Sequence, residues 1–266
     1  MSGALGPALL FCPADRPDRY GKALAAADTV ILDLEDAVAA HRKDAARAAV
    51  AASALPVART VVRVNPVSAG MLEADLAAVD AAGYRTIMLA KAESTADLAP
   101  LGRYAVIALC ETPAGVLAAP ALAAAPNTVG LMWGAEDLVA ALGGRSSRGA
   151  DGRYRDVARA ARAAVLLAAG ASGRAAYDAV HLDLTDDIGL AAEAEDAAAS
   201  GFAGTVCIHP RQVPVVRTAY QPTDAELAWA HRVLEAAAAG GVVAVDGRMV
   251  DEPLLVQARR VVAAAG

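Results

Sequence analysis

The chain has 266 residues, a net charge of −6 and 56% hydrophobic residues, with an isoelectric point of about 5.2. This acidic balance argues against a nucleic-acid-binding protein, which normally carries a basic patch or stripe. No uninterrupted apolar run reaches about 18 residues, and the amino terminus lacks a basic region followed by an apolar core, so we expect neither a membrane span nor a secretory signal.

Eight short apolar runs recur along the chain, and most of them end in polar residues. In chain order they cover residues 8–13, 30–36, 61–66, 86–91, 106–112, 129–137, 179–185 and 204–210. Buried parallel strands read as continuous apolar runs of this kind. The alternation with alanine-rich stretches predicts an α/β fold, a (β/α)₈ TIM barrel, whose chemistry lies at the carboxyl ends of the strands.

The stretches between the runs have helical spacing or helical propensity. The expected helices cover residues 42–53, 75–82, 155–169 and 191–199, and another begins at Thr112-Pro113, with Thr as the cap and Pro at the first helical position. Residues 142–152 are polar and glycine-rich, so this segment is predicted to be either a mobile lid or a binding loop.

The carboxyl-terminal part lies outside the eightfold alternation. We expect a helix over residues 224–239, a short strand within 242–251 and a final helix through residue 263. The predicted domains are therefore the barrel, residues 1–222, and an extension, residues 223–266. This extension either docks on the barrel or contacts a neighbouring subunit.

Three cysteines, Cys12, Cys110 and Cys207, fall inside predicted strands. An odd number of buried cysteines fits reduced core thiols in a cytoplasmic protein.

Two carboxylates end neighbouring predicted strands, Glu111 the fifth and Asp137 the sixth. The ends of adjacent barrel strands lie close together, and two carboxylates without a nearby His or Cys suit Mg²⁺, which also takes water and substrate oxygens. The alternative is a pair of ion-paired surface acids.

A second acidic pair, Glu35 and Asp36, ends the second run, and Arg63 lies between valines in the third. The acids are expected either to orient the metal ligands or to accept a proton, unless Asp36 is a helix cap. Arg63 suits carboxylate recognition and the stabilisation of developing negative charge, or else forms a structural salt bridge to the acidic pair. Lys91 has the same two alternatives, recognition of a negatively charged group or a structural salt bridge. His209 is either catalytic or a hydrogen-bonded core residue.

These residues lie in motifs that resemble the citrate lyase β-subunit-like family, within the HpcH/HpaI aldolase/citrate lyase group. The matching motifs cover residues 10–13, 32–38, 62–65, 111–115, 134–137, 208–212 and 247–253. The resemblance spans nearly the whole chain and implies a barrel of the phosphoenolpyruvate/pyruvate type. The sequence departs from the family's usual pattern at Ala14-Asp15 and at Ala90.

The resemblance implies roles for particular residues. Glu111 and Asp137 would bind Mg²⁺, Arg63 would bind the keto-acid fragment, and Asp251 would transfer a proton in the active site of an adjacent subunit. The implied substrate-binding residues are Phe11, Lys22, Arg63, Glu111, Gly134, Ala135, Glu136 and Asp137, and the implied catalytic residues are Glu35, Asp36, Arg63 and Asp251. Members are commonly trimeric or built from trimers, so a homotrimer is expected.

The expected function is a Mg²⁺-dependent lyase that cleaves a carbon–carbon bond of a 3-hydroxyacyl-CoA. Citryl-, malyl-, citramalyl- and 3-hydroxy-3-methylglutaryl-CoA are candidates, giving acetyl-CoA, or an analogue, and oxaloacetate, glyoxylate, pyruvate or acetoacetate. The alternatives are the β subunit of a multi-subunit citrate lyase acting on a carrier-protein thioester, an aldolase acting on free hydroxy keto acids, and a non-catalytic metal- or CoA-binding protein.

Overall fold

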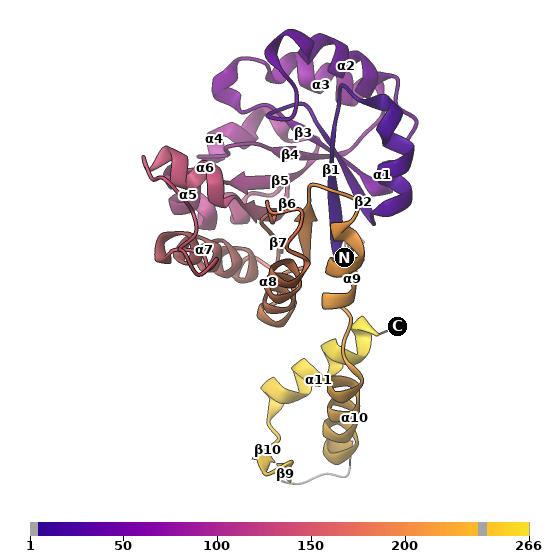
Figure 1. Cartoon of the computed structure of the whole chain (residues 1–266), viewed down its shortest axis with the longest axis vertical. Coiled ribbons are helices and arrows are strands. Elements are labelled where there is room, and N and C mark those ends of the chain that lie inside the picture. Colours follow the sequence, from indigo (N-terminus) through magenta and orange to yellow (C-terminus); the bar gives the residue numbers. More distant parts are fainter. Residues whose placement is uncertain (1–4, 239–243, 266) are drawn as a thin grey trace. The chain divides into compact units, whose positions relative to one another are not determined.

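The computed structural model describes residues 5–238 and 244–265. The chain divides into two compact units, Met1–Val216 and Arg217–Gly266. In the first unit eight parallel strands close into a barrel, in which each strand pairs with its neighbour along the chain and β8 pairs with β1 (Figure 1). The predicted (β/α)₈ barrel is therefore confirmed.

The barrel strands are β1 (Ala8–Pro13), β2 (Thr29–Asp33), β3 (Thr60–Val64), β4 (Thr86–Leu89), β5 (Ala105–Cys110), β6 (Thr128–Trp133), β7 (Ala175–Asp178) and β8 (Gly204–Cys207). The helices of the first unit are α1 (Tyr20–Ala26), α2 (Lys43–Ala51), α3 (Leu72–Ala81), α4 (Thr95–Leu98), α5 (Pro113–Ala124), α6 (Ala135–Ala141), α7 (Asp156–Ala171) and α8 (Asp187–Ser200). Helix α9 (Gln212–Ala219) spans the boundary between the units. As expected, Thr112 caps α5, because its side chain accepts a hydrogen bond from the Gly115 amide.

The interior of the barrel is filled by apolar side chains from every strand, because successive residues of a strand point alternately inward and outward. The core consists of Leu9, Ile31, Val61, Met88, Ile107, Leu109, Met132, Tyr177 and Val206. Gly130 makes room for one of them: a Cβ atom there would meet the Tyr177 ring at 2.9 Å. The barrel is thus a packed core that holds its strand ends in fixed positions. All three cysteines are buried, as expected.

The seventh strand was predicted wrongly, at residues 179–185. The strand that pairs with β6 and β8 is β7, which ends at Asp178. Its alanine-rich sequence carries a weak strand signal. The alternating run that follows leaves the barrel, and Leu182 is 52% exposed.

The sixth strand also ends earlier than predicted. It stops at Trp133, and Gly134 precedes helix α6, so Glu136 and Asp137 lie in the first helical turn rather than at the strand end. Acidic side chains are favourable there because the amino terminus of a helix carries a partial positive charge.

The second unit contains α10 (Asp224–Ala238), a two-stranded sheet and α11 (Glu252–Ala264). The predicted single strand is instead an antiparallel hairpin of β9 (Ala244–Val245) and β10 (Arg248–Met249). Asp246 and Gly247 turn the chain with φ values of 52° and 76°, as a tight hairpin requires. The predicted positions 239, 242 and 243 lie outside the described residues. Ala230, Val233 and Ala258 form a small core of this unit.

No helix in the described part of the chain is long and apolar enough to cross a membrane.

Candidate active site

A cavity of about 80 Å³ lies among residues at the carboxyl ends of the barrel strands. Its lining consists of Phe11, Arg63, Leu109, Glu111, Met132, Gly134, Ala135, Glu136, Asp137, Ala179 and Val180. It therefore gathers most of the predicted substrate-binding residues. Lys22, on α1, is exposed and is not part of this lining.

A larger cavity, of about 330 Å³, lies at the opposite end of the barrel beside Asp28 and Arg59. Both charged groups are engaged by the backbone. Arg59 donates to the carbonyls of Leu24, Ala27 and Asp28, and Asp28 accepts from the Ala8 amide. Chemistry in a barrel of this kind is expected at the carboxyl ends of the strands, so the smaller cavity is the candidate site.

Arg63 is held by a carboxylate that the sequence analysis did not single out. Asp33 and Arg63 face each other in the register of β2 and β3. Arg63 Nε and Nη2 donate to the two oxygens of Asp33 at 2.7 and 2.6 Å, and Nη1 lies 3.1 Å from Glu35 Oε2. The guanidinium also lies 4.4 Å from the centre of the Phe11 ring. These contacts fix its orientation toward the cavity.

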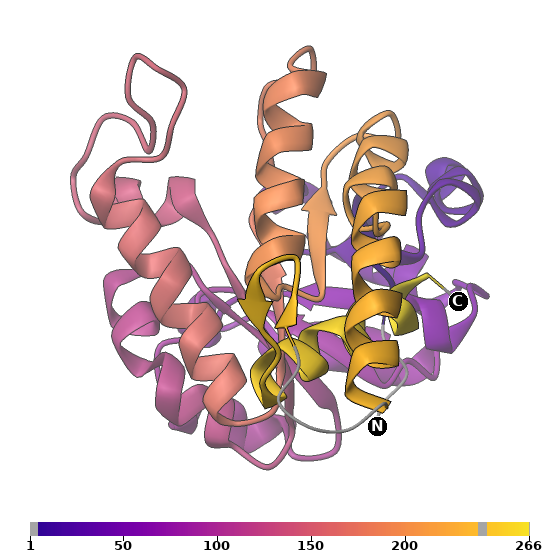
Figure 2. The ribbon, with the colours of Figure 1, turned by 90° about the horizontal axis from the view of Figure 1, so that it is seen from below.

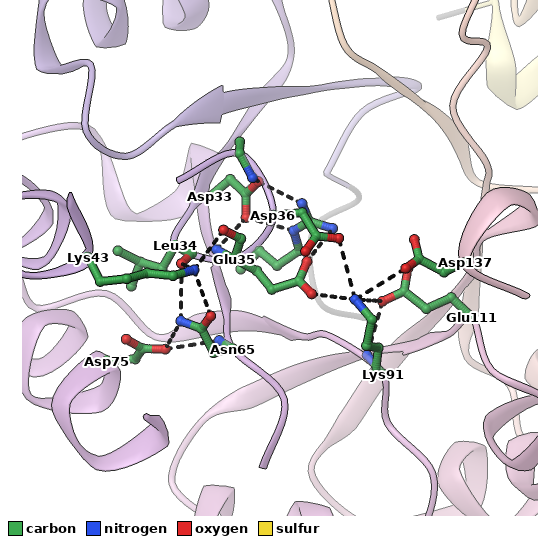
Figure 3. Close-up of polar contacts among 12 residues, drawn as sticks. Asp33, Leu34, Glu35, Asp36, Lys43, Asn65, Asp75, Lys91, Glu111 and Asp137 are labelled. Atoms are coloured by element: carbon green, nitrogen blue, oxygen red, sulfur yellow. Dashed lines mark hydrogen bonds and ion pairs between the residues drawn. The ribbon is translucent and has the colours of Figure 1, made fainter. Parts of the chain in front are cut away.

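Lys91 lies between the two predicted acidic pairs (Figure 3). Its ammonium forms a short hydrogen bond with Glu35 and lies 3.4 Å from Asp36 Oδ2. On the other side it lies 3.8 Å from Glu111 Oε1 and 3.3 Å from Asp137 Oδ1. Burial opposes the charge, but the hydrogen bond to Glu35 and the charge of Glu111 raise the pKa of Lys91 overall. It therefore remains a cation near neutral pH.

The backbone of Lys91 is in the left-handed region, with φ at 48°, which is unusual for a residue other than glycine. In this conformation its amide donates to Glu111 Oε1 at 3.1 Å. The side chain and the backbone of Lys91 thus both contact carboxylates of the site. Residues in such strained conformations are held in place by their surroundings, and they cluster at functional sites.

Glu111 follows β5 and is almost completely buried, whereas Asp137 is partly exposed. Burial, and then the negative charge of Asp137, raises the pKa of Glu111 to about 8. Gly134 allows this carboxyl group to lie against the backbone, because a Cβ atom there would meet Glu111 Cβ at 2.8 Å and Oε2 at 3.0 Å. The two carboxylates brought together here are those predicted as metal ligands.

The charges of the site fit a divalent cation. Five carboxylates, those of Asp33, Glu35, Asp36, Glu111 and Asp137, surround the two cations Arg63 and Lys91. Among the described residues no group of three or more His, Cys, Asp or Glu side chains is arranged to hold a metal. Two carboxylates with the remaining ligands from water and substrate match the requirements of Mg²⁺.

The neighbouring acids have different surroundings. Glu35 is buried between Lys91 and Arg63, and burial raises its pKa although both cations oppose the rise. Asp36 is 61% exposed and follows β2 in a loop that does not begin a helix, so it caps none. Neither residue belongs to the lining of the cavity as the described residues define it.

The connection between α6 and α7 extends past the ends of these helices in Figure 2. Ser147 Oγ donates to Glu136 Oε1 at 2.5 Å. Arg148 Nη2 donates to Glu193 Oε2 on α8 at 3.0 Å, and its guanidinium lies 3.8 Å from the centre of the Tyr154 ring. These contacts tie the segment to two helices, and its role as a lid or as a binding loop stays a prediction.

Two further candidates are not among the residues that line this cavity. His209 is exposed beyond β8, where its Nδ1 accepts a hydrogen bond from the Arg211 amide. It is therefore not a core residue. Asp251 belongs to the second unit and caps α11, since its side chain accepts from the Leu254 amide at 3.3 Å. Its proposed role in catalysis depends on the assembly.

Residues 8–210 match the HpcH/HpaI aldolase/citrate lyase family, and this range contains the whole barrel and its carboxylate cluster. The chain belongs to this family. It is 56% identical to a citrate lyase subunit beta-like protein of Mycobacterium tuberculosis, over 99% of this chain and 97% of the relative. It is 34% identical to a (3S)-malyl-CoA thioesterase of Cereibacter sphaeroides, over 97% and 93% of the two chains.

Solved structures agree with this assignment. The crystal structure of the M. tuberculosis protein CitE in complex with magnesium, acetoacetate and coenzyme A superimposes with a TM-score of 0.96. The two chains are 55% identical, and each is covered completely. Membership in this family makes the chain an enzyme of the lyase class.

Asp33, which holds Arg63, is a residue of the candidate site that the sequence analysis missed. A signal for it was present, because it is a charged residue inside the apolar run 30–36, where an unpaired charge would be costly. Its partner could be deduced only from the strand register, which places it opposite Arg63.

Proposed function

We propose that the protein is a Mg²⁺-dependent lyase that cleaves a carbon–carbon bond of a 3-hydroxyacyl-CoA, releasing acetyl-CoA or an analogue and a keto acid. The observation that carries this proposal is the buried Glu111 beside Asp137, in a cavity that also contains the Arg63 guanidinium. The M. tuberculosis structure contains magnesium, acetoacetate and coenzyme A, a set of ligands that suits this reaction.

Glu111 and Asp137 would hold the Mg²⁺. When bound, the ion would lower the pKa of the substrate's hydroxyl group and neutralise negative charge beside it. Burial raises the pKa of Glu111 to about 8 in the metal-free site, and a bound cation beside it would favour the carboxylate form. Gly134 keeps the space that this carboxyl group needs.

Arg63 would bind the carboxylate or carbonyl of the keto-acid fragment and stabilise the thioester enolate that forms when the bond breaks. Asp33 holds the guanidinium by two hydrogen bonds, so little reorganisation is needed during the reaction. Phe11 and the backbone of residues 134–137, which also line the cavity, would contact the same fragment.

Proton transfer needs an acceptor for the hydroxyl proton and a donor for the enolate carbon. Asp36 is the more exposed member of the acidic pair, and Lys91 contacts both Asp36 and Asp137, so Asp36 would accept the hydroxyl proton. Glu35 would orient Lys91 and Arg63. Asp251, from the extension of a neighbouring subunit, would protonate the enolate carbon, which requires a homotrimer or another oligomer.

The candidate esters are citryl-, malyl-, citramalyl- and 3-hydroxy-3-methylglutaryl-CoA. Their keto-acid products would be oxaloacetate, glyoxylate, pyruvate and acetoacetate. Lys22, exposed on α1, would contact the coenzyme A portion. The three buried cysteines agree with a cytoplasmic location, where thiols remain reduced.

A panel assay tests this proposal. The purified chain with Mg²⁺ is given each of the four esters, and acetyl-CoA release is followed, with Glu111→Gln as the control. Turnover of one ester by the native chain, lost in the variant, is expected. Turnover of none, although Mg²⁺ binds, would favour the subunit of a multi-subunit lyase or a non-catalytic binding protein.

A further inference from the structure

Lys43 lies outside the cavity, at the first position of α2, yet its ammonium reaches the loop that carries Glu35 (Figure 3). Its Nζ donates to the carbonyl oxygens of Leu34 at 2.6 Å and of Glu35 at 2.7 Å, and to Asn65 Oδ1 at 2.8 Å. An ammonium group has three N–H donors, and these three acceptors use all of them. The three hydrogen bonds of Lys43 therefore go to two backbone carbonyls of the loop and to one side-chain amide.

The amide of Asn65 is itself held in one orientation. Its Nδ2 donates to Asp75 Oδ2 at 2.7 Å and to the Leu34 carbonyl at 3.1 Å. Asp75 is completely buried, and its other oxygen accepts from Arg47 Nε at 2.8 Å. Because the NH₂ group must face the Asp75 carboxylate, Oδ1 faces Lys43.

The backbone amides and carbonyls of both Leu34 and Glu35 are hydrogen-bonded. The Leu34 amide donates to the Arg63 carbonyl at 2.9 Å, and the Glu35 amide donates to Asp33 Oδ1 at 2.9 Å. Both carbonyls accept from Lys43. The loop is therefore tied to the same two residues, Asp33 and Arg63, that form the bidentate pair in the site.

We propose that Lys43 is a positioning residue for the reaction. With Asn65 and Asp75 it forms a loop anchor that fixes Glu35 between Lys91 and Arg63, and so determines where these two cations lie beside the cavity. An apolar side chain at position 43 would remove one hydrogen-bond donor from each of the three acceptors. The loop would then shift so that water could replace the lost hydrogen bonds. The inference rests on the proposed function, since it concerns the placement of groups for that reaction.

The test compares the native chain with Lys43→Met, and with Lys43→Cys that is alkylated by 2-bromoethylamine or by iodoacetamide. The first reagent restores an ammonium at nearly the original distance, and the second adds a neutral amide. All three native thiols are buried, and burial raises the pKa of Cys12 to about 11 and of Cys110 to about 12, so we expect the native thiols to react slowly. Arg159→Met, which removes an exposed cation on α7, is the matched control.

For Lys43→Met we expect kcat to fall about tenfold to hundredfold, because small misplacements of catalytic groups have effects of this size. The KM for the thioester and the Mg²⁺ affinity measured by calorimetry should remain near the native values, since Glu111 directly follows β5 and Asp137 lies on α6, so neither belongs to the anchored loop. Aminoethylation should recover most of the lost kcat, and carbamidomethylation should not. Arg159→Met should behave as the native chain.

The inference would be overturned by an unchanged kcat in Lys43→Met, by equal activities after the two alkylations, or by a parallel loss of Mg²⁺ affinity and melting temperature that accounts for the lost activity. A crystal structure of Lys43→Met gives a readout that does not depend on activity. We expect Glu35 to be displaced from Lys91, and an unmoved Glu35 would contradict the role. If the native chain cleaves no thioester, the proposed function fails, and this structure still decides whether Lys43 positions Glu35.

Discussion

Asp33 and Arg63 face each other on neighbouring strands, and two hydrogen bonds of 2.7 and 2.6 Å join the carboxylate to the guanidinium. The pair is almost completely buried. Arg63 therefore has a dual role, because it balances a charge within the barrel and presents a cation to the cavity. The two contributions can be separated by mutation.

Replacing Arg63 with Met leaves the Asp33 charge buried without its partner. We expect the free energy of unfolding to fall by about 3 kcal/mol, as is usual when one member of a buried pair is removed. The double variant Arg63→Met/Asp33→Asn should recover much of this stability, whereas its kcat should remain at least about 100-fold below native. Urea unfolding and steady-state kinetics measure the two effects. Recovery of activity in the double variant would contradict the role of Arg63.

The pKa of Glu111, about 8 in the fold, makes the stability of the metal-free protein depend on pH. Between the ordinary value of 4.5 and 8 the folded chain keeps a proton that the unfolded chain releases. Stability should therefore be greatest below this range and fall as pH rises through it, by up to about 1.4 kcal/mol per pH unit.

Urea unfolding with a chelator at several pH values tests this expectation. Glu111→Gln should show a smaller slope, and Mg²⁺ should stabilise the native chain most at the alkaline end of the range, where the carboxylate form predominates. Equal slopes for the native chain and the variant would exclude Glu111 as the titrating group.

Gly134→Ala should weaken Mg²⁺ binding by about tenfold or more, because the added Cβ atom would displace the Glu111 carboxyl group. The backbone at Gly134, with φ at −130°, accepts alanine without strain, so the effect is steric. The matched control is Gly170→Ala on α7, where a Cβ atom meets nothing within 4 Å. Calorimetry should find native affinity in the control; native affinity in Gly134→Ala as well would show that Glu111 is free to move.

If Asp251 acts in a neighbouring subunit, two inactive variants should complement each other. Asp251→Asn and Glu111→Gln are each expected to be inactive alone. Co-expressed in equal amounts, they should regain about one quarter of native activity, because that share of sites combines a native Glu111 with a native Asp251 from the adjacent subunit. No activity in the mixed oligomer would argue that both groups belong to one chain.

The barrel was predictable from the sequence, because the apolar runs indicate buried strands. The polar residues at the ends of these runs mark the carboxyl ends of the strands, and most of the predicted substrate-binding residues do line one cavity. The prediction failed where local signals were weak or misleading. The alanines of β7 have little strand preference, and the apolar run after them left the barrel. Contacts between distant residues, such as those of Asp33 with Arg63 and of Lys43 with Asn65, depend on register and helix packing, which no local pattern encodes.

The proposed reaction breaks a carbon–carbon bond with a metal held by Glu111 and Asp137. Product analysis by NMR, on the ester that the panel assay selects, is the decisive measurement, because it separates a lyase from a thioesterase such as the C. sphaeroides relative. We expect acetyl-CoA and keto acid in equal amounts, formed only with Mg²⁺ and absent in Glu111→Gln. Free coenzyme A and the intact hydroxy acid, without any keto acid, would contradict the proposed reaction.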